Sequence, residues 1–267
     1  MTHRSISALV FLFFLFSGCG STNTFTPHQQ SSPLSIDGSL SDWDTNRSLF
    51  ESRSEASYYA SFDDDFIYLF VDIKSPFKDR AIRQSGFIIY LSDNEDQRKR
   101  IGVAFPAGSF NLLRENPGAF SSMIRDNEWF SKPENRETLE RLSEDLFSRV
   151  MIVERHDGSS NPEYGFVEKS QLEVDGIEIA ANTDSRNLSI EMKIPRNGSS
   201  IFEFSEQRLW LGFAIEPPNF RRQNESSYST SNNNRDMHGT RQQRAPRQNM
   251  TRAFGAMERW YKLDLSE

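Results

Sequence analysis

The chain has a single cysteine in its 267 residues, so it cannot form an internal disulfide bond. It also lacks the motifs G-x-S-x-G and H-E-x-x-H and any phosphate-binding loop, which are signatures of common hydrolases, zinc proteases and nucleotide-binding enzymes. Hydrophobic residues make up only 36% of the sequence and the mean hydropathy is −0.65, so we expect an economical core and a sizeable share of loop. The net charge of −7 argues against nucleic acid as a partner. Together these absences predict a protein that is not an enzyme and binds no cofactor.

The N-terminus has the features of a secretory leader. Arg4 is followed by an apolar run from Ile6 to Phe16 and then by small residues before Cys19. The run is too short to cross a hydrocarbon core of about 30 Å, which needs about 20 apolar residues. We therefore predict a signal peptide over residues 1–18 rather than a transmembrane helix.

The residues just before Cys19 resemble the lipobox of bacterial lipoproteins. Ser17 and Gly18 match it, whereas Phe16 stands where leucine is usual. The resemblance implies cleavage before Cys19, acylation of that cysteine and, because Gly20 follows it, sorting to the outer membrane of the bacterial cell envelope. The alternative is an ordinary signal peptide with an incidental cysteine. We favour lipidation because it removes the one free thiol of an exported chain.

Three regions follow from this reading. Residues 19–33 are rich in Ser, Thr, Gln and Pro, which predicts a lipid-anchored polar tether. Residues 34–267 are expected to form one folded domain. Within it, residues 221–252 hold seven arginines, no lysine and very few apolar side chains, which predicts a flexible loop. Such arginines could contact phosphate or carboxylate groups, or could merely balance the acidic body.

Alternating apolar and polar residues predict an all-β domain. The expected strands cover residues 55–62, 66–73, 86–92, 100–105, 172–182, 187–195, 208–216 and 259–265. The strand FIYLFVDI is apolar on both faces and is expected to be central, whereas Leu188 to Pro195 alternates and is expected to be half-buried. Because no regular helices separate the strands, we predict an antiparallel, jelly-roll-like β-sandwich.

One helix is expected to interrupt the strands, near residues 133–148. Ser131 is a candidate N-cap, Pro133 lies in the first turn and Glu134 could complete a capping box. Leu139, Leu142 and Leu146 form an apolar stripe on the helix. The segment 106–130 before it is expected to be a long connection.

The segment SIDGSLSDWD resembles the first strand and turn of family 9 carbohydrate-binding-like modules, which are relatives of the DOMON sandwiches. YYASFDDDFIYLFVDI, LSIEMKIP and the last strand from Trp260 to Leu265 are similar to later landmarks of that family, in the same order. Physical chemistry gives the matching residues structural roles: glycine permits a tight turn, aspartates cap backbone N–H groups, and tryptophan closes one end of the core. The landmark residues are Asp37, Gly38, Asp42, Trp43, Asp63, Asp64 and Pro195.

The resemblance implies sugar binding through exposed tryptophan rings. Trp43, Trp210 and Trp260 lie in predicted strands or landmarks and are expected to be packed. Trp129, next to Phe130, is the candidate for an open platform, and the alternative is a packing role that holds the inserted helix to the sandwich.

Metal and haem sites are weakly supported. Relatives that hold calcium use clustered carboxylates, and residues 63–65 and 92–97 carry oxygen ligands, but neither has EF-hand spacing. Some DOMON relatives carry haem on an axial methionine, yet Met192 alternates with apolar residues as an ordinary core side chain does. We expect no bound metal and no haem.

Two function classes remain open after this reading. The first is a non-enzymatic lipoprotein that binds a glycan near the membrane. The second is an envelope accessory protein that uses the same sandwich to dock another protein. An aromatic platform would favour the first, and a flat apolar patch or an open sheet edge would favour the second.

Overall fold

The computed structural model describes residues 23–47, 49–51, 55–126, 128–156, 162–183, 187–196, 201–202, 204, 207–216 and 257–266. The predicted signal peptide, Cys19 and the arginine-rich segment 221–252 lie outside these residues. No helix within the described ranges is long and apolar enough to cross a membrane.

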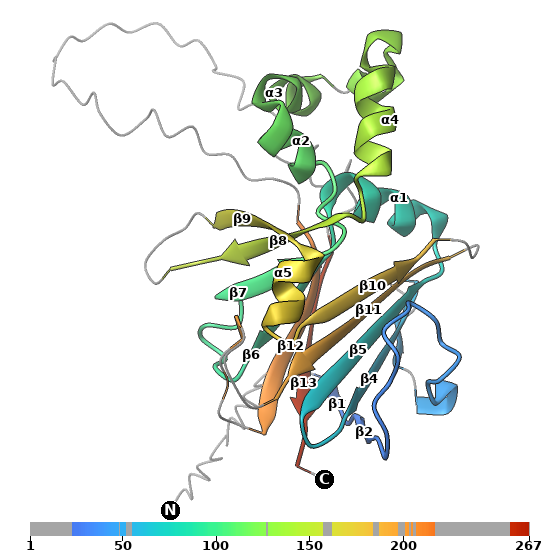
Figure 1. Cartoon of the computed structure of the whole chain (residues 1–267), viewed down its shortest axis with the longest axis vertical. Helices are drawn as coiled ribbons and strands as arrows, with labels where there is room; N and C mark the ends of the chain where they lie inside the picture. The colour runs from blue at the N-terminus through green and yellow to red at the C-terminus, as the bar shows by residue number, and fades with distance from the viewer. Residues whose placement is uncertain are drawn as a thin grey trace, which may run out of the picture.

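Within these residues the strands form two sheets that pack face to face (Figure 1). The seven-stranded sheet has the order β1 (Asn23–Phe25), β13 (Met257–Asp264), β12 (Arg208–Ile215), β6 (Ile88–Ser92), β7 (Ile101–Ala104), β8 (Arg149–Glu154) and β9 (Glu163–Glu168). The six-stranded sheet has the order β10 (Glu178–Asn182), β11 (Leu188–Pro195), β5 (Phe66–Ile73), β4 (Ala56–Phe62) and β2 (His28–Gln29), with β3 (Leu49–Glu51) also paired to β4. All pairs are antiparallel except β1 with β13 and β2 with β4. The predicted antiparallel β-sandwich is confirmed.

The core between the sheets is built by the apolar positions that the alternation identified. Phe213 of β12 is fully buried and stacks on Tyr58 of β4, with ring centroids 4.6 Å apart. The rings of Phe87 and Tyr261 also lie next to the Phe213 ring, with centroid distances of 5.9 and 6.1 Å. Strand β5 is covered on both faces, as its composition predicts, and Met192 is a buried core residue. Aromatic stacking thus joins the two sheets at their centre.

The N-terminal segment is not a free tether over its described part. Asn23–Phe25 pairs with β13 at the edge of one sheet, and His28–Gln29 pairs with β4 at the edge of the other. Phe25 is buried and lies against Tyr261. The expectation of a polar tether over residues 19–33 is therefore wrong from residue 23 onward. Backbone pairing, to which polar residues contribute as well as apolar ones, outweighs composition in this short stretch.

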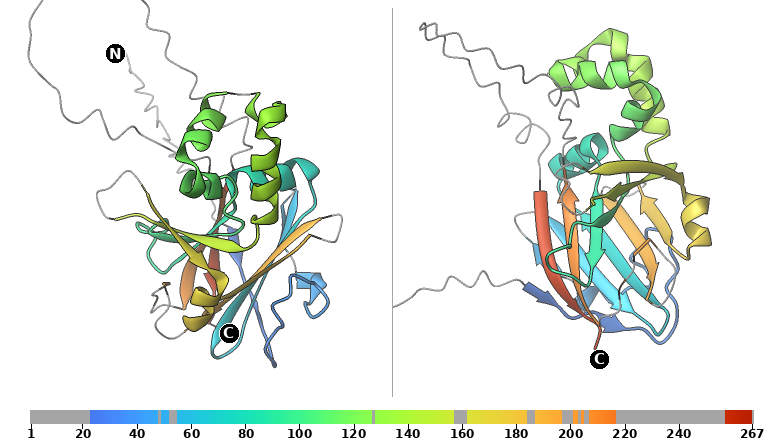
Figure 2. Two further views of the ribbon diagram at one scale, coloured as in Figure 1. Left: turned by 45° about the horizontal axis from the view of Figure 1, so that its top comes forward. Right: turned by 90° about the vertical axis from the view of Figure 1, so that its left-hand side faces the viewer.

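Helices occur at more places than the sequence predicts. Helices α2, α3 and α4 gather beyond one end of the sandwich, and α1 lies between them and the sheets (Figure 2). Their bounds are α1 (Pro76–Ser85), α2 (Phe110–Glu115), α3 (Pro117–Arg125) and α4 (Arg136–Glu144), with two 3-10 turns at Trp129–Ser131 and Pro133–Asn135. Asn116 caps α3 by accepting the N–H of Ala119, and Pro117 follows at its first position. The expected long connection over 106–130 is therefore largely helical.

Helix α4 confirms the inserted helix but not its predicted start. Ser131 does not cap it, because its hydroxyl donates to the carbonyl of Glu128 inside a 3-10 turn. Asn135 occupies the N-cap position, but its side chain makes no capping hydrogen bond to the helix. Its side-chain amide donates to the carbonyl of Trp129. The leucine stripe is confirmed, since Leu146 is buried and the other two leucines pack on the α2 and α3 side chains.

The predicted strand over 172–182 is in fact a helix followed by a strand. Helix α5 (Lys169–Val174) begins with a capping box between Glu168 and Gln171, and β10 begins at Glu178. Gly176 turns the chain between them with φ of +75°. Strands β8 and β9 and the short η1 turn (Thr45–Arg47) were not expected from the sequence.

Candidate functional site on the seven-stranded sheet

The outer surface of the seven-stranded sheet carries a set of aromatic rings on neighbouring strands. We call the rings of Tyr90, Trp210 and Trp260, on β6, β12 and β13, the aromatic face. Trp260 pairs across the strands with Gly212, and Gly212 pairs in turn with Tyr90. The strand register thus places two large rings on either side of a residue without a side chain.

The glycines leave room for the rings against the neighbouring strands. A Cβ atom on Gly212 would lie 2.5 Å from the Trp260 ring, and one on Gly102 would lie 2.6 Å from the Tyr90 ring. The rings of Tyr90 and Trp260 are themselves stacked, with centroids 5.8 Å apart and planes 26° apart. The face of an aromatic ring can stack against another flat group.

Four charged side chains form a rim beside these rings: Lys99, Arg155, Glu216 and Glu258. Lys99 pairs with both glutamates, at 2.8 Å to Glu216 and 2.6 Å to Glu258. Arg155 donates to Glu216 at 2.7 Å and to the hydroxyl of Tyr90 at 2.8 Å. The Trp260 indole N–H donates to Glu258 at 2.6 Å. The charged rim and the aromatic face are therefore one hydrogen-bonded network.

The network fixes the protonation state of several members. Burial acts to raise the pKa of Glu258, but hydrogen bonds from Lys99 and Trp260 lower it overall, so Glu258 is ionised at neutral pH. Burial raises the pKa of the Tyr90 hydroxyl, which keeps it neutral. Burial acts to lower the pKa of Arg155, but Tyr90 and Glu216 raise it overall, so the guanidinium stays charged.

Of the three rings, Trp260 is the one that reaches solvent. Tyr90 is fully buried, beneath the cationic groups of Lys99 and Arg155, and Trp210 is 7% exposed. Trp260 is half-buried, and the guanidinium of Arg98 lies 5.0 Å from its ring centroid. A guanidinium over an indole is a cation–π contact that a planar ligand could replace.

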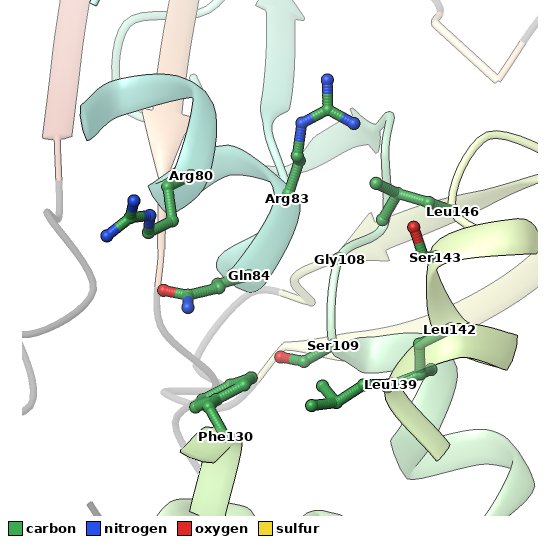
Figure 3. A pocket seen from close by; sticks show the side chains of 10 residues that line it. All are labelled: Arg80, Arg83, Gln84, Gly108, Ser109, Phe130, Leu139, Leu142, Ser143 and Leu146. Atoms are coloured by element: carbon green, nitrogen blue, oxygen red, sulfur yellow. The ribbon is translucent and has the colours of Figure 1, made fainter. Parts of the chain in front are cut away.

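The structure places Trp129 and Phe130 differently from the sequence-based expectation. Trp129 is 3% exposed and packs among buried side chains of α2 and α3, so it cannot be an open platform. It holds the helices of the insertion to one another, which is close to the packing role considered as the alternative. Phe130 meets Trp129 edge to face and lines a pocket between α1 and α4 (Figure 3).

The first family landmark has a structural role that depends on a residue the sequence did not single out. Glu191 of β11 is fully buried and accepts three N–H groups, from the backbone of Asp37 at 3.0 Å, the backbone of Gly38 at 2.8 Å and the indole of Trp43 at 2.8 Å. Alternation had placed Glu191 on the polar face of a half-buried strand, and this expectation is wrong. The N-terminal segment covers that face, and its hydrogen bonds to Glu191 hold the segment there.

The other landmark residues act as turn and cap groups. Gly38 has φ of +76°, and Asp42 accepts the backbone N–H of Ser35, as expected. Asp37 likewise accepts the N–H of Ser39. Trp43 is buried, but on the outer face of the six-stranded sheet against Tyr59 and Phe70, not at the end of the central core.

The acidic turn of the second landmark is also structural. Asp63 accepts the backbone N–H groups of Asp65 and Phe66 and the hydroxyl of Tyr68, while Asp64 is exposed. Pro195 ends β11 opposite Phe66. Among the described residues, no three His, Cys, Asp or Glu side chains are grouped so that they could hold a metal ion.

Sequence reasoning missed the charged rim and the role of the aromatic face. Its members come from four separate places: the β6–β7 turn, the ends of β8 and β12, and β13. Tryptophan and tyrosine at alternate strand positions signalled only packing. The glycines opposite them, Gly102 and Gly212, were the signal that could have indicated rings packed closely over neighbouring strands.

The fold and this face define a β-sandwich with an aromatic and charged surface on one sheet. No protein family matches the chain, and no curated protein matches it. Two solved structures are similar to it, both of a family 9 carbohydrate-binding module from Caldicellulosiruptor kristjanssonii. The one in complex with glucose has a TM-score of 0.32 and 12% identity, and covers 73% of this chain and 79% of its own. The one in complex with cellotriose has a TM-score of 0.30 and 11% identity, and covers 72% of this chain and 76% of its own.

Proposed function

We propose that this protein binds a glycan on the aromatic face without chemical turnover, as a lipid-anchored protein of the bacterial cell envelope. The observation that supports binding is the half-buried Trp260 ring, which lies against Gly212 of the neighbouring strand beside a charged rim. A pyranose has a C–H face that packs on an indole and an edge of hydroxyl groups that bond to carboxylates and guanidinium groups. The sugar takes the place that the Arg98 guanidinium occupies over Trp260.

The rim supports binding rather than hydrolysis. Glycoside hydrolysis requires a carboxylic acid with a raised pKa beside a second carboxylate. Hydrogen bonds from Lys99 and Trp260 lower the pKa of Glu258, and both rim glutamates are paired with the same lysine. A carboxylate held ionised, as Glu258 is, is suited to accept hydrogen bonds from sugar hydroxyl groups.

Replacing Trp260 with alanine is expected to weaken glycan binding at least about tenfold, because the stacking surface is removed. Binding is measured by a glycan array that includes glucose and cellotriose, followed by affinity electrophoresis in gels of the best polysaccharide. Arg98→Ala is expected to strengthen binding about two- to fivefold, since it removes a competing contact of about 0.5–1 kcal/mol.

The matched control is Phe77→Ala on α1, which removes an exposed aromatic ring outside the site, 59% exposed. This variant should bind as the parent does. Equal losses in both variants would mean that the aromatic face is not the site. Binding of another envelope protein but of no glycan would favour the docking function instead, and reproducible cleavage of any glycan would contradict the absence of turnover.

Lipid anchoring at Cys19 is tested separately. Cys19→Ala is expected to move the protein from the membrane fraction to the soluble fraction, because the acyl chains supply the membrane affinity. The measurement is immunoblotting of fractionated cells together with the mass of the mature N-terminus. A variant that loses its leader normally and stays in the membrane fraction would contradict the proposal.

A further inference from the structure

A pocket of about 200 Å³ lies between α1 and the helical insertion, away from the aromatic face (Figure 3). Its base is the backbone of Gly108 and the side chain of Ser109, just before α2. One side is formed by Arg80, Arg83 and Gln84 of α1. A cavity of this volume has room for a small organic molecule.

The pocket is amphipathic, and its two sides differ in character. The side opposite α1 is apolar and consists of Phe130, Leu139, Leu142 and Leu146, with Ser143 as its one polar member. The α1 side contributes two guanidinium groups, and none of the described residues that line the pocket is a carboxylate. In a protein with a net charge of −7, this is a local concentration of positive charge next to an apolar wall.

The two arginines are not equivalent. Arg83 is already paired, since its Nε lies 2.6 Å from Asp79 and its guanidinium lies over the Phe147 ring. Arg80 is exposed at the mouth of the pocket and has no ion-pair partner among the described residues. Arg80 is therefore the cation that an anionic ligand would meet.

The base of the pocket contains a polar group without a partner. Ser109 is 5% exposed, and its hydroxyl makes no hydrogen bond within the described part of the chain. Figure 3 shows this hydroxyl directed into the space between Gln84 and Phe130. A buried hydroxyl without a partner is unfavourable, and a ligand oxygen that reaches it would remove that cost.

We propose that this pocket binds a small organic anion with an apolar body, of the class of alkyl carboxylates. The carboxylate lies toward Arg80 and accepts the hydrogen of the Ser109 hydroxyl, and the alkyl chain packs on the leucines of α4. This site is separate from the glycan site, so either can exist without the other. Recognition requires both parts of the ligand. A carboxylate without an apolar body would stay in water, and an apolar molecule without a carboxylate would leave the Ser109 hydroxyl without a partner.

The test uses octanoate and its uncharged analogue octanamide as probes, with the full chain and ligand-observed NMR titration. The full chain is expected to bind octanoate at least tenfold more tightly than octanamide. Arg80→Gln should remove that preference, and Ser109→Ala should weaken octanoate binding about threefold. Arg125→Gln, an exposed arginine in the last turn of α3, is the charge-matched control and should change nothing.

Three results would overturn the proposal. These are no saturable binding of octanoate, equal affinity for the two probes, and an equal loss in the Arg80 and Arg125 variants, which would indicate general attraction to a basic surface. Leu142→Ser provides a second check on the apolar wall and should weaken the binding of both octanoate and octanamide. Because Arg80 is exposed, its variant is expected to fold, which the thermal unfolding midpoint verifies.

Discussion

Replacing Glu191 with alanine is expected to lower the free energy of unfolding by about 3–5 kcal/mol. The carboxylate accepts three N–H groups from the segment that covers the outer face of the six-stranded sheet. Its removal leaves the Gly38 N–H and the Trp43 indole N–H without an acceptor in a buried site. Urea unfolding followed by tryptophan fluorescence measures the loss.

The control is Glu173→Gln on α5, an exposed glutamate whose replacement should change stability by less than about 0.5 kcal/mol. Glu191→Gln keeps the shape of the side chain but directs an N–H₂ group at N–H donors, so we expect an intermediate loss. A Glu191→Ala variant as stable as the control would show that the N-terminal segment is held by its apolar contacts alone.

The same residue predicts a pH dependence. Burial raises the pKa of Glu191 from its ordinary 4.5 to about 7, although the hydrogen bonds from Trp43 and Gly38 offset part of that rise. Between these two values the folded state retains a proton that the unfolded state has lost. Stability should therefore fall as the pH rises from about 4.5 to about 7, relative to Glu191→Gln, with a slope of at most about 1.4 kcal/mol per pH unit. Parallel pH profiles of the two proteins would contradict this.

Replacing Gly212 with valine is expected to cost about 2–3 kcal/mol of stability and to abolish glycan binding. A Cβ atom at this position would lie 2.5 Å from the Trp260 ring, so the ring must leave the sheet. Its displacement also breaks the indole hydrogen bond to Glu258. Thermal unfolding and affinity electrophoresis measure the two effects.

Gly165 of β9 provides the matched control, because a Cβ atom there would meet nothing within 4 Å. Gly165→Val should leave stability unchanged or slightly raised, since a β-branched residue suits a strand. If both valine variants behave alike, the position of the Trp260 ring does not depend on the absence of a side chain at Gly212. If Gly212→Val unfolds easily but still binds the glycan, the site lies elsewhere.

Much of the sandwich follows from the sequence because local pattern and burial agree. Phe66–Ile73 carries apolar residues on both faces, with Asp72 as its one charged member, and it is the covered central strand. The polar stretch at residues 23–29 has no such pattern. Its strands form because two sheet edges offer free backbone groups to it, and this depends on where distant residues lie.

The candidate site and the buried position of Glu191 were less predictable for the same reason. Glu191 is a glutamate at an alternating position, which normally faces water, and only the fold brings three N–H donors to it. Trp260 and Tyr90 meet because the residue between them on β12 is Gly212, which has no side chain to separate the rings. Neighbourhoods created by strand register across the sheet cannot be read from a single stretch of chain.

The pairing of residues 23–29 with both sheets also determines how far the domain stands from a bilayer. With acylation at Cys19 as proposed, three residues lie between the lipid-bearing cysteine and Asn23, so the linking chain reaches at most about 14 Å. A free linker ending at residue 33 would have reached about 50 Å. The β1 end of the sandwich would then lie close to the lipid headgroups, and the short link would restrict reorientation of the domain relative to the bilayer. Helices α2–α4, at the opposite end, would point outward with the α1–α4 pocket open to the compartment beyond the membrane surface (Figure 1).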